Sequence, residues 1–376
     1  MVNRSTMTGK KYDQQMAAAV ESGSGMEWHS ADEEPFVLEG FHWREKGGPF
    51  RRMPPNTPEH PLPEGVDRFA NHAAGGQLRF KTDSPSIMVK VSVRTMNNAA
   101  DIMTYSRIGF DLYAGAPQAS HFVGVTKVNF DDLDLRKCSY CATVFKAEGK
   151  AWREFTLNFP LYASVDAFAI GFEPGAKFAA PSPRCDPRPI VVYGTSIQQG
   201  CCASRPGRCH TNILSRVLNR PFINLGFAGS GKGEPEVARI LAGIRTPALY
   251  VLDYDSNATL ESLERTLPVF TDILRTAHPE TPILTVSRMY YPSDYPPSPE
   301  QAQYSDDRIT RTAIHVANLK RHRATGNRQV HFLDGIMLFG DDYAECCVDD
   351  SHATDLGFYR IANVLGPEME RILSPV

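Results

Sequence analysis

The stretch that decides the fold is IVVYGTSIQQG at residues 190–200. It begins with a short run of β-branched and aromatic residues, typical of a buried strand, and ends in residues typical of a turn. Similar runs recur at 221–227, 248–254, 282–288 and 329–335, and longer amphipathic patterns separate them. This alternation favours a parallel sheet covered by helices. We therefore predict an α/β domain over residues 190–376.

The sequence before this domain has a different pattern. Between residues 36 and 176, apolar residues alternate or form short runs, as in IMVKVSV at 87–93 and HFVGVTKV at 121–128. This pattern predicts an antiparallel, jelly-roll-like β-sandwich. Residues 177–189 are rich in proline and are predicted to link the two domains. Residues 1–35 are largely polar, and we expect a flexible N-terminal segment there.

Composition and charge argue against several classes of protein. The formal net charge is -3, so neither nucleic acid nor an anionic membrane is expected as a partner. No apolar run is long enough for a transmembrane helix, and the N-terminus lacks the basic-then-apolar pattern of a signal peptide. We therefore expect a cytoplasmic protein. The oligomeric state stays open.

The chain has eight cysteines, which we expect to be free thiols in a cytoplasmic protein. Cys138 and Cys141 form one CxxC pair without a second pair at zinc-ribbon spacing, so no metal site is predicted. Two pairs of adjacent cysteines stand close to the polar segments described next. We expect these four residues to line or support a site: Cys201, Cys202, Cys346 and Cys347.

Polar residues and glycines follow three of the predicted strands. Ligands of an open parallel sheet bind beyond the carboxyl ends of its strands, so these positions are candidates for a site. Ser196 lies in the turn after the first strand, where a serine can also serve as a helix N-cap. Gly229 follows the second strand, where an N–H without a neighbouring Cβ can face a ligand. Asn257 follows the third strand and is either an amide donor or a turn residue.

The glycine-rich segment around Gly229 could also be read as a phosphate loop. GFAGSGKG lacks the spacing and the terminal Ser or Thr of GxxxxGK[ST], so nucleotide binding is not predicted. Lys232 is interpreted as a surface or rim charge. No cofactor is predicted.

Near the C-terminus, CVDDSHATDLGF places Asp349 three residues before His352. That spacing allows the carboxylate to bind one imidazole nitrogen while the other faces a serine hydroxyl. Ser196, His352 and Asp349 are therefore the candidate catalytic residues. The backbone N–H groups of Ser196 and Gly229 and the Asn257 amide are candidate donors to an oxyanion.

The order Ser196, Gly229, Asn257 and Asp349-x-x-His352 resembles the four sequence blocks of SGNH hydrolases, the GDSL-like lipases and esterases, across residues 188–374. The resemblance implies a flavodoxin-like sheet and a serine that forms an acyl-enzyme. Three further segments resemble the subgroup with an N-terminal β-sandwich: GFDLY at 109–113, LNFPLY at 157–162 and FAIGFEPGA at 168–176.

Two blocks depart from the family pattern. The first reads GTS where the family has GDS, and the third reads DYDSN where it commonly has GxND. The serine and the asparagine are retained. Asp253 and Asp255, in the third block, are candidate substitutes in local hydrogen bonding.

The resemblance implies an esterase or an O-acyltransferase, and the motif does not separate them. Water resolves the acyl-enzyme of a carbohydrate or small-ester esterase, whereas a hydroxyl acceptor resolves that of an acyltransferase. The pattern is also similar to SGNH-type acyltransferases of tetracycline tailoring, which implies a salicylyl-like group moved from an acyl-CoA donor to a glycosylated polyketide. We favour this intracellular acyltransferase. An inactive glycan-binding protein is a further alternative.

For several residues outside the blocks, the sequence leaves two roles open. Arg288, Tyr290, Tyr291 and Tyr295 follow the fourth strand and are candidate substrate contacts, although a salt bridge or exposed tyrosines would fit equally. Asp111 and Tyr113 in GFDLY either contact a ligand or hold strands together. For the sandwich domain we favour a lid or structural role over a glycan-binding module.

Overall fold

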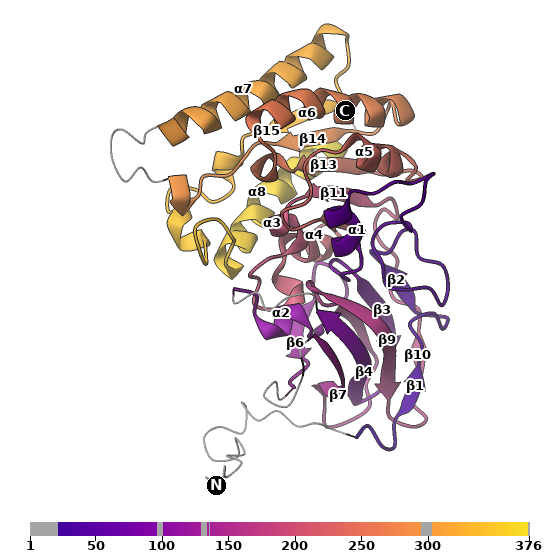
Figure 1. Ribbon diagram of the computed structural model, residues 1–376. Helices are drawn as coiled ribbons and strands as arrows, with labels where there is room; N and C mark the ends of the chain where they lie inside the picture. Colours follow the sequence, from indigo (N-terminus) through magenta and orange to yellow (C-terminus); the bar gives the residue numbers. More distant parts are fainter. Residues whose placement is uncertain (1–21, 96–100, 129–133, 135, 295–302, 375–376) are drawn as a thin grey trace, which may run out of the picture.

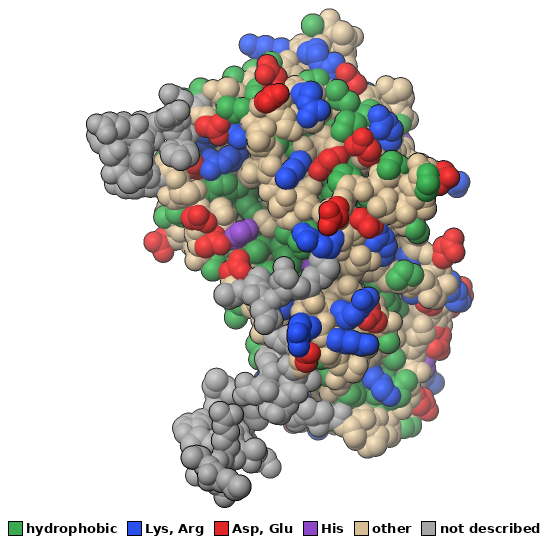
Figure 2. All heavy atoms as spheres, in the orientation of Figure 1, with side chains coloured by type: hydrophobic (Ala, Val, Ile, Leu, Met, Phe, Trp, Pro, Cys, Tyr) green, Lys and Arg blue, Asp and Glu red, His purple; other side chains and the backbone are tan. Residues whose placement is uncertain are grey.

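The computed structural model describes residues 22–95, 101–128, 134, 136–294 and 303–374. Two antiparallel sheets form the lower half of the molecule in Figure 1, and a parallel sheet with its helices forms the upper half. Acidic and basic side chains are interspersed on the face drawn in Figure 2. None of the described helices is long and apolar enough to cross a membrane.

The two antiparallel sheets make the predicted β-sandwich. The first has the order β1 (Glu27–His29), β9 (Ala163–Phe172), β4 (Ser86–Thr95) and β7 (Lys137–Lys146). The second has the order β10 (Phe178–Ala179), β3 (Gln77–Thr82), β8 (Arg153–Asn158), β5 (Asp111–Ala114) and β6 (His121–Val125), and β2 (Val37–Glu39) also pairs with β3. Side chains from both sheets fill one core that is rich in buried phenylalanine.

Two of these strands lie outside the range predicted for the sandwich. β1 comes from the segment that we expected to be flexible and pairs with β9, and β10 comes from the predicted linker and pairs with β3. Strands of 3 and 2 residues are too short to show an alternating pattern. The exact domain bounds stay a prediction.

The parallel sheet has the order β12 (Phe222–Gly226), β11 (Ile190–Gly194), β13 (Leu249–Asp253), β14 (Ile283–Val286) and β15 (Val330–Leu333). This is the flavodoxin-like order, and it confirms the predicted α/β fold. Every strand of this sheet was expected from its short apolar run. The strand order reverses between β11 and β13, because β12 lies on the other side of β11, and open sheets of this kind bind ligands beyond the carboxyl ends of the strands at that point.

Helices cover both faces of this sheet. The helices α4 (His210–Val217) and α8 (Asp355–Leu373) pack on one face, and α1 (Glu64–Ala70), α5 (Pro235–Ala242) and α6 (Leu260–Ala277) pack on the other. The long α7 (Gln303–Ala324) lies against α6 and β15 (Figure 1). Although α1 falls in the range predicted for the sandwich, its buried Val66 and Ala70 belong to the core of the parallel sheet.

Shorter helical elements connect the strands near the carboxyl ends. They are α2 (Thr104–Arg107), α3 (Ser196–Gln199) and the 3-10 turns η4 (Pro206–Arg208), η5 (Asp255–Asn257), η6 (Pro292–Asp294), η8 (Gly335–Met337) and η9 (Tyr343–Cys346). Several of these elements carry the residues of the site described below.

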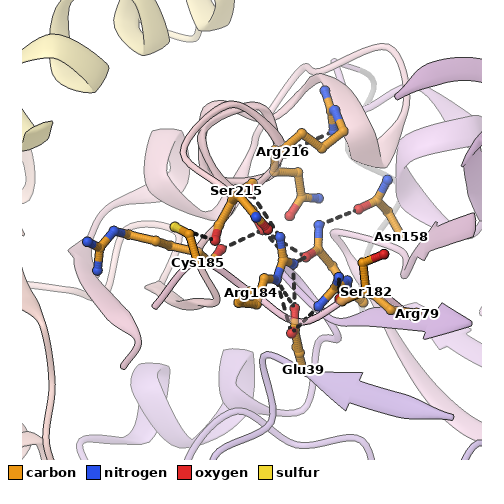
Figure 3. Close-up of polar contacts among 12 residues, drawn as sticks. Glu39, Arg79, Asn158, Ser182, Arg184, Cys185, Ser215 and Arg216 are labelled. Atoms are coloured by element: carbon orange, nitrogen blue, oxygen red, sulfur yellow. Dashed lines mark hydrogen bonds and ion pairs between the residues drawn. The ribbon is translucent and has the colours of Figure 1, made fainter. Parts of the chain in front are cut away.

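Polar contacts join the sandwich to the parallel-sheet half, and Arg184 in the predicted linker is central to them (Figure 3). Its guanidinium donates to the Glu39 carboxylate on β2, to Gln77 Oε1 at 3.0 Å, and to the Ser215 carbonyl at 3.0 Å on α4. Arg79 on β3 also donates to Glu39, at 3.0 Å. The linker is therefore bonded to both halves of the molecule.

Arg52 makes a second junction. Its fully buried guanidinium donates to the carbonyls of Phe69 and His72 at 2.7 and 2.8 Å, and to those of Asn224 and Gly226 on β12 at 2.9 and 2.8 Å. Burial lowers the pKa of Arg52 to about 9, which still leaves it protonated at neutral pH. Arg52 thus ties the residues around α1 to the end of β12.

The GFDLY segment makes a third junction. Asp111 Oδ2 accepts from Arg205 Nη1 at 2.6 Å and from the Gly207 N–H at 2.9 Å, and both partners belong to the parallel-sheet half. The Tyr113 hydroxyl accepts from Arg205 at 2.8 Å. The sequence left open whether Asp111 and Tyr113 contact a ligand or hold strands together. Their contacts fit a structural role, and they join the two halves of the molecule as well.

Candidate active site

Ser196 stands where the first strand of the parallel sheet turns into a helix. Thr195 is the N-cap of α3, and it forms a capping box with Gln198: its hydroxyl accepts from the Ile197 N–H at 3.2 Å while its own N–H donates to Gln198 Oε1 at 2.8 Å. The capping role that the sequence left open for Ser196 therefore belongs to Thr195. Ser196, the first residue of α3, keeps its hydroxyl for another partner.

That partner is His352. Ser196 Oγ lies 2.9 Å from His352 Nε2, and His352 Nδ1 lies 2.7 Å from Asp349 Oδ2. Because a carboxylate only accepts, Nδ1 carries the proton of the neutral imidazole and Nε2 accepts from the serine hydroxyl. The three residues that the sequence singled out are thus brought together in a continuous chain of hydrogen bonds.

The loop before α8 holds Asp349 in position. Its Oδ1 accepts from the N–H groups of Ser351 and His352 at 2.9 and 2.6 Å. Burial alone would raise the pKa of Asp349, but the hydrogen bonds from His352 and Ser351 outweigh it and hold this pKa below its usual value. Asp349 is therefore ionised at neutral pH and orients the imidazole.

Two thiols add to the electrostatics of His352. Its pKa is raised, mainly by a hydrogen bond with Cys201, against a lowering by burial, and Asp349 raises it further. The pKa of Cys201 is lowered, first by its hydrogen bond with Cys202 and also by His352, whereas the pKa of Cys202 is raised. The two groups are therefore coupled: a thiolate at Cys201 favours protonated His352, whereas a neutral thiol leaves His352 Nε2 free to accept the proton of Ser196.

Three N–H donors face the space beside Ser196. Gly229 has a positive φ of 62°, and a Cβ added there would meet no atom within 4 Å. The space next to its Cα is therefore empty. Within the described part of the chain, no acceptor bonds the N–H of Gly229 or of Ser196. The Asn257 Nδ2 is buried and also lacks a partner among those residues. All three residues line the same cavity.

The two aspartates of the third block lie behind the site. Asp253 Oδ2 accepts from Gln198 Nε2 at 2.6 Å, which ties the end of β13 to the serine turn. Asp255 accepts from Arg311 Nη1 at 2.6 Å and from the Arg288 N–H at 2.8 Å. Burial, with a smaller effect of Asp255, raises the pKa of Asp253 to about 8. Both side chains make local hydrogen bonds, the role for which the sequence made them candidates.

A cavity of about 550 Å³ surrounds these groups. Its apolar wall comes from Phe69, Ile102, Tyr162, Ile197, Ala228 and Tyr291, and Ser196, Gly229, Asn257 and His352 lie in its polar part. Phe69, Ile102 and Tyr162 precede the parallel sheet in the sequence. The cavity is therefore built by segments from before and after the start of the parallel sheet, and it is large enough for more than a two-carbon acyl group.

The substrate contacts proposed from the loop after β14 differ in position. Arg288 lines the cavity and donates to Asp294 at 2.8 Å. Its position is therefore compatible with a substrate contact and with a salt bridge, the two roles that the sequence left open. Tyr291 is in the lining and its hydroxyl lies 2.8 Å from Ser256 Oγ. Tyr290 is outside the lining and packs edge-on against Tyr343. Tyr295 lies outside the described residues.

His72 is a residue of the cavity that the sequence did not indicate. Gln199 Oε1 accepts from the Ala228 N–H and Gln199 Nε2 donates to the Leu161 carbonyl, so the orientation of this amide is defined. The same Nε2 donates to His72 Nδ1 at 3.0 Å, which leaves the proton of the imidazole on His72 Nε2. That atom is buried and has no partner among the described residues. No local motif marks His72; the fold brings it to the cavity wall.

The cysteines divide by position. All eight are free, and Cys201 lines the cavity while Cys202 lies just behind it. Cys346 and Cys347 support the loop that carries His352. Cys138 and Cys141 lie three residues apart on β7, so their side chains leave opposite faces of that strand. Lys232 is exposed, in keeping with a surface charge.

Family models match both halves of the chain. The model of the GDSL-like lipase/acylhydrolase family matches residues 187–370, and that of the N-terminus of SGNH-hydrolase-type esterases matches residues 26–178. The chain belongs to the SGNH/GDSL hydrolase superfamily, in the subgroup with an N-terminal β-sandwich. It is therefore an enzyme of the esterase and acyltransferase type.

Solved structures share the whole two-part arrangement. A GDSL-like lipase from Bacteroides ovatus is 27% identical, with a TM-score of 0.80, and the match covers 93% of this chain and 98% of the other. A salicylyl acyltransferase from a tetracycline biosynthetic pathway is 19% identical, with a TM-score of 0.70 and the same coverage. A family two carbohydrate esterase from Cellvibrio japonicus is 10% identical, with a TM-score of 0.55, over 93% of this chain and 98% of that one. The last two similarities concern the fold. No curated protein sequence matches the chain.

Proposed function

We propose that this enzyme transfers acyl groups through an ester formed on Ser196, with His352 as the general base and Asp349 as the residue that orients it. The observation that carries the proposal is the unbroken chain from Ser196 Oγ to His352 Nε2 and from His352 Nδ1 to Asp349 Oδ2, at 2.9 and 2.7 Å. A serine hydroxyl is a poor nucleophile unless a base takes its proton during the attack.

In the first half of the reaction, Ser196 Oγ bonds to the acyl carbon and its proton passes to His352 Nε2. The carbonyl oxygen becomes an oxyanion, which the N–H groups of Ser196 and Gly229 and the Asn257 amide stabilise. When the intermediate collapses, the bond to the leaving thiol or alcohol breaks and His352 returns the proton to it. In the second half, His352 deprotonates the acceptor, which attacks the acyl-enzyme by the same path.

For the substrates we propose an aromatic, salicylyl-like acyl group from a coenzyme A thioester and a hydroxyl of a glycosylated small molecule. The cavity supports this proposal because an aromatic acyl group finds apolar contacts on Phe69, Ile102 and Tyr162. The unpartnered His72 Nε2–H offers one further hydrogen bond to a substrate oxygen or nitrogen. The cytoplasmic location expected from the sequence fits an acyl-CoA donor and stays a prediction.

Hydrolysis is the second candidate, and one observation favours it. The side chains of His352 and Asp349 are 25% and 34% exposed. Water can therefore reach His352, the base that would deprotonate it for attack on the acyl-enzyme. An acyl-enzyme open to water is hydrolysed unless the acceptor excludes it. A carbohydrate or small-ester esterase would then result from the same residues.

Intact-protein mass spectrometry combined with product analysis separates these functions. The enzyme is exposed in parallel to salicylyl-CoA, acetyl-CoA and p-nitrophenyl acetate, with and without an added sugar alcohol, and Ser196→Ala is the control. We expect a salicylyl adduct that Ser196→Ala lacks and an ester product on the added alcohol.

Two other outcomes have defined meanings. Release of free acid from every donor, unaffected by the added alcohol, would replace the transferase with an esterase. Neither an adduct nor turnover with any donor would overturn acyl transfer on Ser196.

A further inference from the structure

Four side chains with metal-binding atoms cluster beside the candidate nucleophile. They are Asp101, Cys201, Cys202 and His352, and one ligand atom from each lies within 4.8 Å of the others. Asp101 precedes α2, the two cysteines follow α3, and His352 comes from the loop before α8. Three separate parts of the chain therefore converge on this point, which is referred to below as the thiol cluster.

The spacing of the two thiols and Asp101 in the thiol cluster is close to that of a tetrahedral metal site. Cys201 Sγ and Cys202 Sγ are 3.4 Å apart, and they lie 3.9 and 3.8 Å from Asp101 Oδ2. A zinc ion with bonds of about 2.3 Å to sulfur and about 2.0–2.2 Å to nitrogen or oxygen places neighbouring ligand atoms roughly 3.3–3.8 Å apart. Around an ion the two sulfur atoms would separate by about 0.4 Å, and Asp101 Oδ2 would approach them by about 0.2–0.3 Å.

The backbone favours this convergence of adjacent thiols. Cys202 has a φ of 71°, in the left-handed region that residues with a Cβ seldom adopt. This conformation places both cysteine side chains on the Asp101 side of α3, where each contacts the same carboxylate. Neither cysteine forms a disulfide.

The donor set suits zinc in particular. Two thiolates, an imidazole and a carboxylate are ligands that Zn²⁺ accepts in four-coordinate sites, and thiolates disfavour Mg²⁺ and Ca²⁺. Asp349 bonds to Nδ1 of His352, so only Nε2 is left to bind a metal. A carboxylate behind a ligating histidine is the usual support in such sites.

We propose that the thiol cluster binds a zinc ion that inhibits the enzyme reversibly, a regulatory role that rests on the proposed function of Ser196. Binding deprotonates both thiols, and the ion takes the electron pair of His352 Nε2 that otherwise accepts the proton of Ser196 Oγ. The serine then has no base. Because Cys201, Asp101 and His352 line the cavity, the ion enters from the substrate side, and a bound acyl donor and zinc would compete.

Cobalt binding tests the site independently of catalysis. Reduced Ser196→Ala protein is titrated with Co²⁺, and we expect one equivalent to bind with a thiolate-to-cobalt charge-transfer band that Zn²⁺ abolishes by displacement. Cys202→Ser and Asp101→Asn should weaken binding at least tenfold. Cys347→Ser is the matched control, because this partly exposed thiol also has a cysteine neighbour but lies outside the thiol cluster.

An activity assay tests the inhibition. Ser196-dependent hydrolysis of p-nitrophenyl acetate is measured with and without Zn²⁺ at a concentration that saturates the cobalt-defined site. We expect zinc to lower the rate at least tenfold and a chelator to restore it. In Cys202→Ser, the rates with and without zinc should be nearly equal. Thermal unfolding checks that this variant is folded.

The cobalt titration and the activity assay can contradict the proposal independently. Absence of the charge-transfer band, or a band that Cys202→Ser and Asp101→Asn leave unchanged, would overturn the metal site whatever the activity. Zinc that binds at the cluster while hydrolysis proceeds at full rate would overturn the inhibition. A protein that binds cobalt as expected but never forms an acyl-enzyme would keep the site and remove the proposed function.

Discussion

At the scale of single residues, Asn257 tests the oxyanion assignment. Its Nδ2 is buried without a partner in the described chain, an arrangement that costs stability unless a ligand uses it. We expect Asn257→Ala to lower kcat about a hundredfold, or about 3 kcal/mol in the barrier, with little change in KM, because the donor acts mainly in the transition state. A rise in KM at unchanged kcat would instead make Asn257 a contact of the ground state.

Asp349 tests the orientation of the histidine. Asp349→Asn keeps the size of the side chain but presents an amide to Nδ1, which favours the wrong tautomer, so kcat should fall by about a thousandfold or more. The matched control is Asp341→Asn, an exposed carboxylate of the loop before η9, which should leave kcat within about twofold. Similar kinetics for the two variants would contradict the role of Asp349.

The sequence indicated the site residues that come from strand ends and from one short motif. Ser196, Gly229 and Asn257 each follow a strand of the parallel sheet, and Asp349 and His352 are close in sequence, so local rules together with the block order of the family made them candidates. His72 has no such signal, because its position depends on packing between distant segments. The thiols were expected near the site, but their contact with Asp101 required the fold.

At the scale of elements, Asp253 couples the end of β13 to the serine turn. Its pKa is raised from 3.8 to about 8 by burial and Asp255, so the folded protein retains a proton that the unfolded chain has lost over this range. Stability therefore falls as pH rises between these values, by up to about 1.4 kcal/mol per pH unit, and levels off above the folded pKa.

Replacing Asp253 with asparagine removes this dependence while keeping an acceptor for Gln198. We expect the free energy of unfolding of the wild type, relative to Asp253→Asn, to decrease from pH 5.5 to about 8 in urea titrations. Parallel pH profiles for the two proteins would show that Asp253 is ionised in the folded state.

The elements themselves were predictable to different degrees. The strands of the parallel sheet are continuous apolar runs between turns, and all of them were found within about two residues of their ends. β1 and β10 gave no pattern because they are so short. The predicted range of the sandwich domain included α1, although α1 packs on the parallel sheet. Its position in the sequence, before that sheet, gives no sign of this packing.

At the scale of the whole molecule, Arg52 links the residues around α1 to β12, and so connects two walls of the cavity. Its loss would remove the Arg52 donor from four carbonyls, those of Phe69, His72, Asn224 and Gly226. We expect Arg52→Met to lower the free energy of unfolding by more than about 3 kcal/mol. The control is Arg94→Met, whose ion pair with Asp166 is exposed and should be worth less than about 1 kcal/mol. Equal effects in thermal unfolding would contradict the role of Arg52.

If Ser196 is an activated nucleophile, a fluorophosphonate should label it. Because this reagent reacts with a serine whose proton is taken by a base, we expect one phosphonyl group per chain, located on Ser196 by peptide mass spectrometry and absent from Ser196→Ala. A correctly folded protein that stays unlabelled, or that carries the label on another residue, would show that Ser196 is not an activated nucleophile.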